Sequence, residues 1–208
     1  MIVSMDLPAL TTNRLLIRPL RTDDQDAVER LYADIAQEAG SDWAMTRAEV
    51  QRWLQWTALS YSEQARLHQP PYGDRAISLR ETNQLIGICG FVPCLDAFGQ
   101  LPSFAGASSR PGERLTSAQF GLYWAVAPSQ QRRGYATEAG RALIDHAFGR
   151  LKLDRIVATT TYHNVASIGV MQKLGMQIDR NPYPDPPWLQ VVGVLSHPSL
   201  SGGKSVEA

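Results

Sequence analysis

The stretch from residue 119 to residue 148 constrains the fold of this chain more than any other. Gln119 to Val126 is a β-rich run that Ala127 and Pro128 close, and the segment QQRRGYATEA follows. A helical pattern comes next, with Ala139, Leu143, Ile144, Ala147 and Phe148 on one face. A strand that passes through a glycine turn into a helix directs several backbone N–H groups and the positive helix end at one point. The sequence therefore predicts an anion site, suited to phosphate, at this turn.

The composition of the turn fits that role without matching the common nucleotide motifs. Gly134 lets the backbone approach a ligand closely, Ala136 keeps the helix start small, and Arg132 and Arg133 add positive charge. The turn is neither GxxxxGK[ST] nor GxGxxG, so it lacks the nucleoside triphosphate and dinucleotide fingerprints. Two plainer interpretations stay open: the turn is an ordinary strand-to-helix connection, and the two arginines are solvated surface charges.

The rest of the chain reads as one α/β domain over residues 1–196 with a flexible tail over 197–208, which is small, polar and rich in Gly and Ser. Leu15 and Ile17 mark an inward-facing strand, and Thr46 with Glu49 predicts a capping box for a second helix. A loop without secondary structure is expected over residues 96–116. The other elements are a helix around 25–35, a hairpin of 75–80 with 85–92, a strand over 156–161, a helix over 165–174 that Gly175 ends, and strands over 176–179 and 189–195.

Charge and cysteine content exclude several classes of protein. Lys plus Arg and Asp plus Glu each total 20, so no net field draws the chain to nucleic acid or to an anionic membrane. No run of 18 apolar residues predicts a membrane span, and no secretory signal is seen. Cys89 and Cys94 lack CxxC spacing and a histidine cluster, so neither a disulfide framework nor a zinc site is indicated. We expect a reduced, cytoplasmic setting and no metal.

Several segments in order resemble the GNAT superfamily of acetyltransferases. Its signature (Q/R)xxGx(G/A) is matched by Gln131, Gly134 and Ala136, and the chain continues from Gly134 as GYATEAGRALIDHAF. RIVATT and HNVASIGVMQKLGM follow at the spacing of the branch that includes ribosomal-protein N-terminal (alanine) acetyltransferases, and NRLLIRPL precedes them. The likeness covers most of residues 11–195. It implies a mixed, mostly antiparallel central sheet of about six to seven strands, flanked by about four helices, with a splayed strand before the CoA-binding turn.

The resemblance also implies the site residues. Acetyl-CoA, as co-substrate, is expected on a set of backbone and side-chain groups at the turn: Gln131, Arg132, Arg133, Gly134, Tyr135, Ala136 and Thr137. The Val126 amide is the expected donor to the thioester carbonyl. Asn164 is expected to hold the pantetheine or the sulfur, and Ser167 to donate to the departing sulfur. Capping of the following helix is the alternative role for both residues. Gln119 and Tyr123 are expected to line the acceptor pocket, where a core role for Tyr123 is the alternative.

Two positions depart from the family pattern. Gln119 stands where many members of the branch carry a glutamate, and a carboxamide cannot take a proton. A water chain or another carboxylate, such as Glu38, Asp42 or Glu113, must then act as base. Met171 stands where other members place a tyrosine acid. In the first helical region, which forms one wall of the acceptor groove in this family, we expect core packing for at least two of Trp43, Trp53 and Trp56.

The hypothesis from sequence is therefore an acetyl-CoA-dependent N-acyltransferase. It transfers an acetyl group to a primary amine, either a protein N-terminus or a small molecule, by direct attack in a ternary complex. The alternative is an acyl-CoA-binding sensor or partner-binding module of the same fold with little transferase activity, which the missing Glu and Tyr favour. An amine acceptor is the expected partner, with no nucleic acid or membrane, and the chain is expected to be a monomer or a homodimer.

Overall fold

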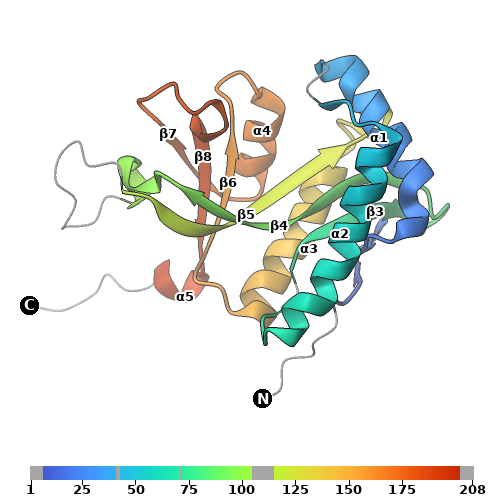
Figure 1. Ribbon diagram of the computed structural model, residues 1–208. Coiled ribbons are helices and arrows are strands. Elements are labelled where there is room, and N and C mark those ends of the chain that lie inside the picture. Colours follow the sequence, from blue (N-terminus) through green and yellow to red (C-terminus); the bar gives the residue numbers. More distant parts are fainter. Residues whose placement is uncertain (1–6, 41–42, 71, 105–114, 202–208) are drawn as a thin grey trace, which may run out of the picture. The chain divides into compact units, whose positions relative to one another are not determined.

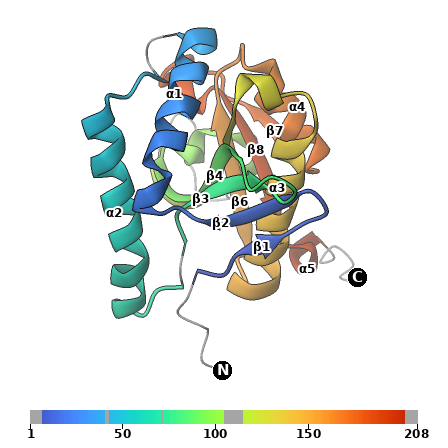
Figure 2. The same ribbon diagram turned by 90° about the vertical axis from the view of Figure 1, so that its right-hand side faces the viewer.

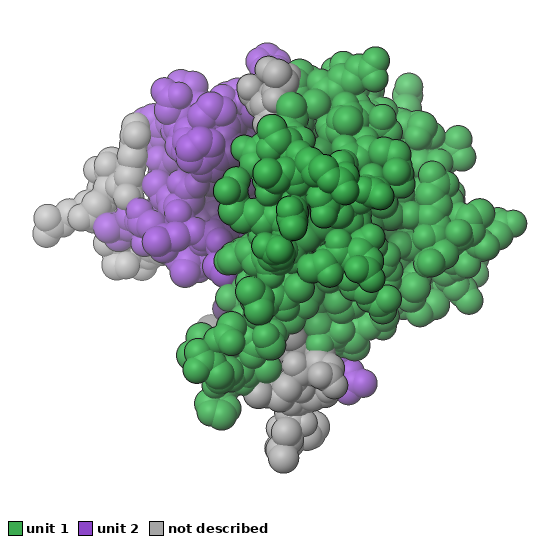
Figure 3. All heavy atoms as spheres, turned by 45° about the vertical axis from the view of Figure 1, so that its right-hand side comes forward, with its two compact units in different colours: residues 1–91, 124–143 green, residues 92–123, 144–208 purple. Residues whose placement is uncertain are grey.

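The computed structural model describes residues 7–40, 43–70, 72–104 and 115–201. The chain divides into two compact units, the first of residues 1–91 and 124–143 and the second of residues 92–123 and 144–208 (Figure 3). Strands β4 (Leu85–Asp96) and β5 (Ser117–Val126) and helix α3 (Tyr135–His146) contribute residues to both units. Each unit has its own strands and its own buried side chains.

The first unit is built on antiparallel strands. β1 (Leu10–Thr11), β2 (Leu15–Pro19), β3 (Asp74–Leu79), β4 and β5 are neighbours in that order. Ile17 pairs with Ile77, and both are fully buried, as is Leu15. The predicted inward face of the first long strand is thereby confirmed, because alternate residues of a strand point to one face.

Two helices of the first unit run side by side (Figure 2). α1 (Gln25–Ala39) buries Val28, Leu31 and Ile35. At the start of α2 (Arg47–Arg66) the Thr46 hydroxyl accepts from the Glu49 amide at 3.3 Å, and the Glu49 carboxylate accepts from the Thr46 amide at 2.8 Å. The predicted capping box is confirmed, and it explains why the helix begins at this residue.

The tryptophans of this region correct one expectation. Trp43 is 46% exposed and Trp56 is 63% exposed, so the prediction that at least two of the three tryptophans lie in the core is wrong. Trp53 does pack, edge-on against Tyr32 with ring centroids 6.0 Å apart. The inward face of α2 already contains Leu54, and Trp56 lies roughly 200° around the helix from it.

The second unit holds β5, β6 (Arg155–Thr160), β8 (Val191–Ser196) and β7 (Gln177–Arg180) in that order. Gly121 of β5 pairs in parallel with Val157, and the two remaining pairs are antiparallel. α4 (Val165–Lys173) packs on β6, β8 and β7 (Figure 1). Gly175 follows α4 with a φ of +82°, which confirms the predicted glycine stop.

The segment expected to be a loop without structure is partly ordered. Short 3₁₀ turns cover Phe98–Gln100 and Pro102–Phe104. Phe98 and Leu101 are fully buried against a core cluster of Val157, Leu189, Val192 and Val194, and the Ser103 amide donates to the carboxylate of Asp179 at 2.7 Å. The expectation is therefore wrong for residues 98–104, whereas residues 105–114, Glu113 among them, lie outside the described part of the chain.

The described residues contain eight strands and five α-helices, so the predicted α/β class is confirmed and the predicted counts were slightly low. The additional elements are the two-residue strand β1 and the short helix α5 (Pro198–Ser201). α5 lies within the predicted tail, and residues 202–208 are not described. The limits 1–196 and 197–208 stay a prediction.

Candidate functional site: a glycine turn at the start of α3

The turn between β5 and α3 lies in the first unit and begins with a 3₁₀ turn over Pro128–Gln130. Arg132 and Gly134 both have positive φ, +58° and +83° respectively, and α3 starts directly afterwards at Tyr135. Left-handed residues next to right-handed ones direct consecutive N–H groups to one side, and the first turn of a helix adds N–H groups without intrahelical partners. The turn therefore has the backbone geometry of an anion site.

Gln131 attaches the turn to the end of β5. Its side-chain amide donates to the backbone oxygen of Val126 at 3.2 Å. The glutamine of the signature thus holds the turn against the strand, which gives this residue a structural role beside any contact to a ligand. The turn cannot move away from the strand end without losing this bond.

Arg14, just before β2, also holds the turn, and no local sequence pattern indicates this role. Its guanidinium donates to the Arg133 carbonyl at 3.0 Å, pairs with the Glu138 carboxylate at 2.6 Å, and lies 4.5 Å from the centre of the Tyr135 ring. The Arg14 amide and the Thr12 hydroxyl also donate to Glu138, at 3.0 and 2.6 Å. These contacts join residues more than 100 positions apart, so no local pattern indicates them.

The network determines the charge of the first turn of α3. Burial raises the pKa of Glu138, but the hydrogen bonds from Thr12 and Arg14 outweigh it, and the pKa lies below its usual value. The carboxylate stays ionised and neutralises Arg14 at close range. Arg132 and Arg133 are exposed, and their side chains therefore remain the accessible positive charges of the turn.

The remaining predicted residues of the turn are Tyr135, Ala136 and Thr137, all half-buried in the first turn of α3. The Tyr135 ring lies beneath Arg14. At Gly134 an added Cβ would meet only the Arg14 guanidinium, at 3.5 Å, so the space over this backbone is open. An open, anion-oriented backbone with small residues fits a pyrophosphate group.

The direction of the Val126 amide follows from its neighbour. The Ala127 N–H donates to the Ile86 carbonyl at 2.8 Å, toward β4. Successive N–H groups of a strand point to opposite edges, so the Val126 N–H points away from β4. The thioester donor that the resemblance implies needs this orientation, and its contact with a ligand stays a prediction.

Asn164 and Ser167 lie in the second unit, at the start of α4. The Asn164 side-chain oxygen accepts from the Ser167 amide at 3.0 Å, so Asn164 caps the helix. The capping role that the sequence left as an alternative is therefore present. This bond uses the Asn164 oxygen and the Ser167 backbone, and it engages neither the Asn164 NH₂ group nor the Ser167 hydroxyl. Met171 is 1% exposed and packs against Gly193, so the position where other members carry the tyrosine acid belongs to the core.

Gln119 and Tyr123 lie on the part of β5 that belongs to the second unit. They share one face of the strand with Ser117 and Gly121, because alternate residues of a strand point to the same face. Both are half-buried, and the Gln119 side-chain amide donates to the Ser117 hydroxyl at 3.3 Å. The strand therefore places the two residues predicted for the acceptor pocket on one face, and their contact with an acceptor stays a prediction.

Of the three carboxylates considered as alternative bases, the structure describes only that of Glu38. Glu38 is exposed on α1, which belongs to the first unit. Asp42 and Glu113 lie outside the described residues. A role for any of the three as the base stays a prediction.

Two further features bear on the chemistry of the chain. Cys89 and Cys94 are free, and burial raises the pKa of the Cys89 thiol to about 12, so this thiol is not a nucleophile at neutral pH. Within the described residues no group of His, Cys, Asp and Glu side chains could hold a metal ion. No helix in the same part of the chain is long and apolar enough to cross a membrane.

Comparison with known proteins identifies the family. Residues 14–177 match the model of the acetyltransferase (GNAT) domain, so the chain belongs to the GNAT acetyltransferase family. The uncharacterized N-acetyltransferase YnaD of Bacillus subtilis is 26% identical over 172 residues, which is 81% of this chain and 82% of the relative.

Solved structures show the same fold at lower identity. RimL, a ribosomal alpha-N-protein acetyltransferase in complex with coenzyme A, is 13% identical with a TM-score of 0.64, over 91% of this chain and 98% of the other. An aminoglycoside acetyltransferase in complex with coenzyme A is 17% identical with a TM-score of 0.58, over 92% and 99%. The mixed sheet and its helices therefore form the GNAT fold, and the chain is an acyltransferase of this family.

Proposed function

We propose that the protein transfers an acetyl group from acetyl-CoA to a primary amine, a protein N-terminus or a small molecule, by direct attack in a ternary complex. The observation that carries the proposal is the turn before α3, where positive φ at Arg132 and Gly134 orients the backbone N–H groups toward an open space. Gln131 and Arg14 hold this turn in place. Relatives with this fold are named as acetyltransferases of a ribosomal protein and of aminoglycosides, which supports both acceptor classes.

The residues of the turn fit the pyrophosphate of acetyl-CoA. Gly134, Tyr135, Ala136 and Thr137 supply backbone donors at the start of α3, where the helix dipole favours an anion. The side chains of Arg132 and Arg133 are exposed and add positive charge. When bound, acetyl-CoA supplies an activated acetyl group as a thioester.

The chain's own groups then perform three tasks. The Val126 N–H, which points away from β4, donates to the oxygen on which negative charge develops during attack. The Asn164 NH₂ group holds the pantetheine arm. The Ser167 hydroxyl donates to the departing sulfur, since Met171 cannot act as an acid.

Removal of the proton from the acceptor is the step for which the chain supplies the least help, because Gln119 cannot take a proton. A general base contributes typically 10²–10⁴-fold, and positioning and electrostatic stabilisation remain without it. An acceptor with a lowered pKa needs this assistance less. We therefore expect an α-amine to be a better substrate than an ordinary lysine side chain.

A second candidate is a protein that binds acyl-CoA and transfers poorly, as a sensor or partner-binding module. Two observations favour it: Met171 is a core residue, and Gln119 donates to Ser117. This candidate would bind coenzyme A at the same site as the enzyme but would transfer little or no acetyl group. The cytoplasmic location and the monomeric or homodimeric state stay predictions under both candidates.

The test is a parallel screen with acetyl-CoA, in which release of free thiol is followed with peptides and small amines as acceptors. Acceptor-dependent thiol release supports the enzyme. Stabilisation by coenzyme A without thiol release on any acceptor supports the sensor. The absence of any stabilisation by coenzyme A at millimolar concentration contradicts both.

A further inference from the structure

A carboxylate at the end of β4 is held in a fixed position by an exposed tryptophan. In the second unit one Asp96 oxygen accepts from the Trp188 indole N–H at 2.7 Å, and the other accepts from the Ala97 amide at 2.9 Å. Each carboxylate oxygen has two lone pairs, so both oxygens can still accept from a ligand. The side chain is thus ordered by the protein without being saturated.

Trp188 is itself anchored. It lies in the 3₁₀ turn Pro187–Leu189, and the adjacent Leu189 is fully buried in the cluster with Phe98 and Leu101. The indole is nevertheless 60% exposed. A large aromatic side chain that is fixed at its ring nitrogen and largely exposed to solvent can attract a cation to its ring.

Asp96 shares a strand face with the residues expected to line the acceptor pocket. An added Cβ at Gly121 would lie 2.3 Å from the Cys94 sulfur, so Cys94 of β4 and Gly121 of β5 point to the same face. Asp96 is two residues beyond Cys94, and Gln119 and Tyr123 are two residues on either side of Gly121. By the period of two, Asp96, Gln119 and Tyr123 therefore belong to this face.

Among the described residues, no ion pair neutralises the charge of Asp96. No Lys, Arg or His within the described part of the chain lies within ion-pair distance of its carboxylate. A hydrogen bond between charged groups is stronger than one between neutral groups, and an ammonium supplies such a donor. A cation on this site also gains the attraction of the indole ring.

We propose that Asp96 and the Trp188 indole bind the ammonium group of the acceptor. This inference rests on the proposed function and names its substrate class: a cationic aliphatic amine, such as an α-amine, lysine or amino sugar, in preference to a neutral arylamine. Asp96 and the Trp188 ring both contact the substrate, and the Trp188 N–H also positions the Asp96 carboxylate. The bound ammonium releases its proton to solvent water before the neutral amine attacks the thioester.

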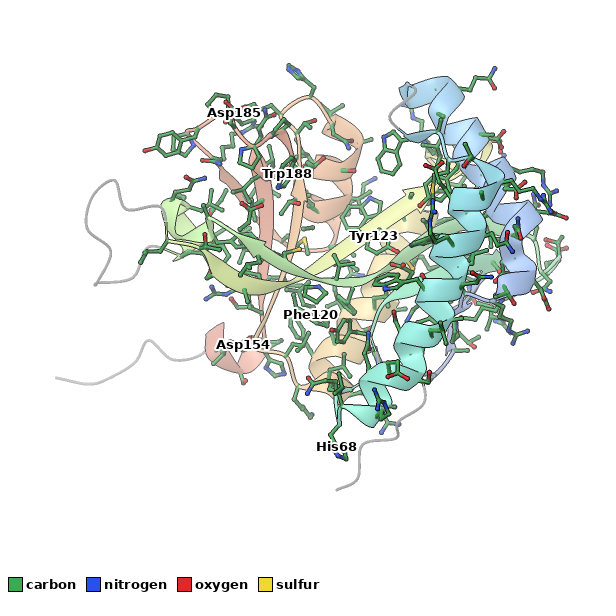
Figure 4. The ribbon with its side chains drawn as sticks, in the orientation of Figure 1. His68, Phe120, Tyr123, Asp154, Asp185 and Trp188 are labelled. Carbon is green, nitrogen blue, oxygen red and sulfur yellow. The ribbon has the colours of Figure 1, made fainter. Side chains whose placement is uncertain are left out.

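The experiment compares kinetics of the wild-type protein and three variants on four acceptors. The cationic acceptors are an alanine peptide with a free N-terminus, an N-blocked lysine peptide and an aminoglycoside, and the neutral acceptor is aniline. Asp96→Asn keeps the shape and removes the charge, and Trp188→Phe keeps the ring and removes the donor. Asp154→Asn is the matched control, because it makes the same change far from the site (Figure 4). Asp154 precedes β6 and Trp188 precedes β8. These two strands are antiparallel, so the two residues lie near opposite ends of the strand pair.

We expect Asp96→Asn to raise KM for the best cationic acceptor by roughly ten- to hundredfold, with a much smaller change in kcat and in KM for aniline. Trp188→Phe should raise KM in the same direction by less, and Asp154→Asn should resemble the wild type. Equal KM values for Asp96→Asn and the wild type on cationic acceptors would overturn the site while leaving the proposed function intact. A wild-type protein that is stabilised by coenzyme A but acetylates none of the four acceptors contradicts the proposed function itself, and the site with it.

Discussion

Replacement of Gly134 by valine separates the cost of backbone strain from the loss of a ligand site. Gly134 has a φ of +83°, in the left-handed region, and its new Cβ would lie 3.5 Å from the Arg14 guanidinium, which is an ordinary contact. The cost of the substitution therefore comes from the backbone and should be about 1–2 kcal/mol. For a chain of this size that lowers Tm by roughly 2–8 °C.

The same substitution should abolish stabilisation by coenzyme A. A ligand at a hundred times its Kd stabilises the native state by about 2.7 kcal/mol, which raises the wild-type Tm by roughly 5–11 °C. In the Gly134→Val variant the side chain would lie over the backbone that we propose to contact the pyrophosphate. Thermal unfolding with and without coenzyme A should therefore show a folded variant whose Tm does not respond.

Gly175→Val is the matched control for this prediction. Gly175 has nearly the same φ, +82°, follows α4, and has no atom within 4 Å of an added Cβ. Its variant should lose a similar amount of stability and keep the full response to coenzyme A. If Gly134→Val also keeps the full response, the turn is not the coenzyme site and the reasoning is refuted.

Three further predictions concern the surroundings of the turn and the acceptor. The pKa of Glu138 is lowered, so its contribution to stability is present above the usual value of 4.5 and is lost as the pH falls through the lowered pKa. In urea unfolding, the Glu138→Gln variant should show a free energy of unfolding that changes less with pH in this acid range. A pH dependence equal to that of the wild type contradicts the network with Arg14. Gly87→Ala would place a Cβ 2.5 Å from the Ala125 oxygen and should destabilise the fold by about 1–3 kcal/mol in urea unfolding, whereas wild-type stability would show that the strands adjust freely. At pH 7 an α-amine of pKa about 7.7–8.0 is over two hundredfold more often neutral than a lysine of pKa about 10.4. A peptide with a free N-terminus should therefore react faster than an N-blocked lysine peptide, and Gln119→Glu should reduce the difference between the two rates. Rapid acetylation of the lysine peptide by the wild type would show that a base exists.

Local patterns in the sequence predicted the local structure well. Thr46 with Glu49, the glycine after α4 and the helix start after Gly134 all depend on residues a few positions apart, and each is confirmed. The family, too, follows from short motifs in a fixed order. Each of these signals is complete within a short segment, because capping and turn geometry depend on neighbouring residues.

Long-range contacts could not be predicted in the same way. Arg14 reaches Glu138 and the Arg133 carbonyl across more than 100 residues, and a lone arginine just before a strand gives no sign of these contacts. Trp188 reaches Asp96 because its neighbour Leu189 packs into the core cluster. Asp96 begins the segment over residues 96–116, whose Gly, Pro and Ser content predicts only a loop. Such contacts arise from tertiary packing, which residue types in sequence do not encode locally.

The central claim, transfer of an acetyl group to an amine, is tested most directly by mass spectrometry of an acceptor after incubation with acetyl-CoA. A peptide with a free N-terminus, an aminoglycoside and a no-enzyme control should be measured together with the free thiol released. We predict that at least one amine gains a single acetyl group in amounts equal to the thiol formed. Stabilisation by coenzyme A with no acetylated product on any acceptor would contradict the account and favour the sensor.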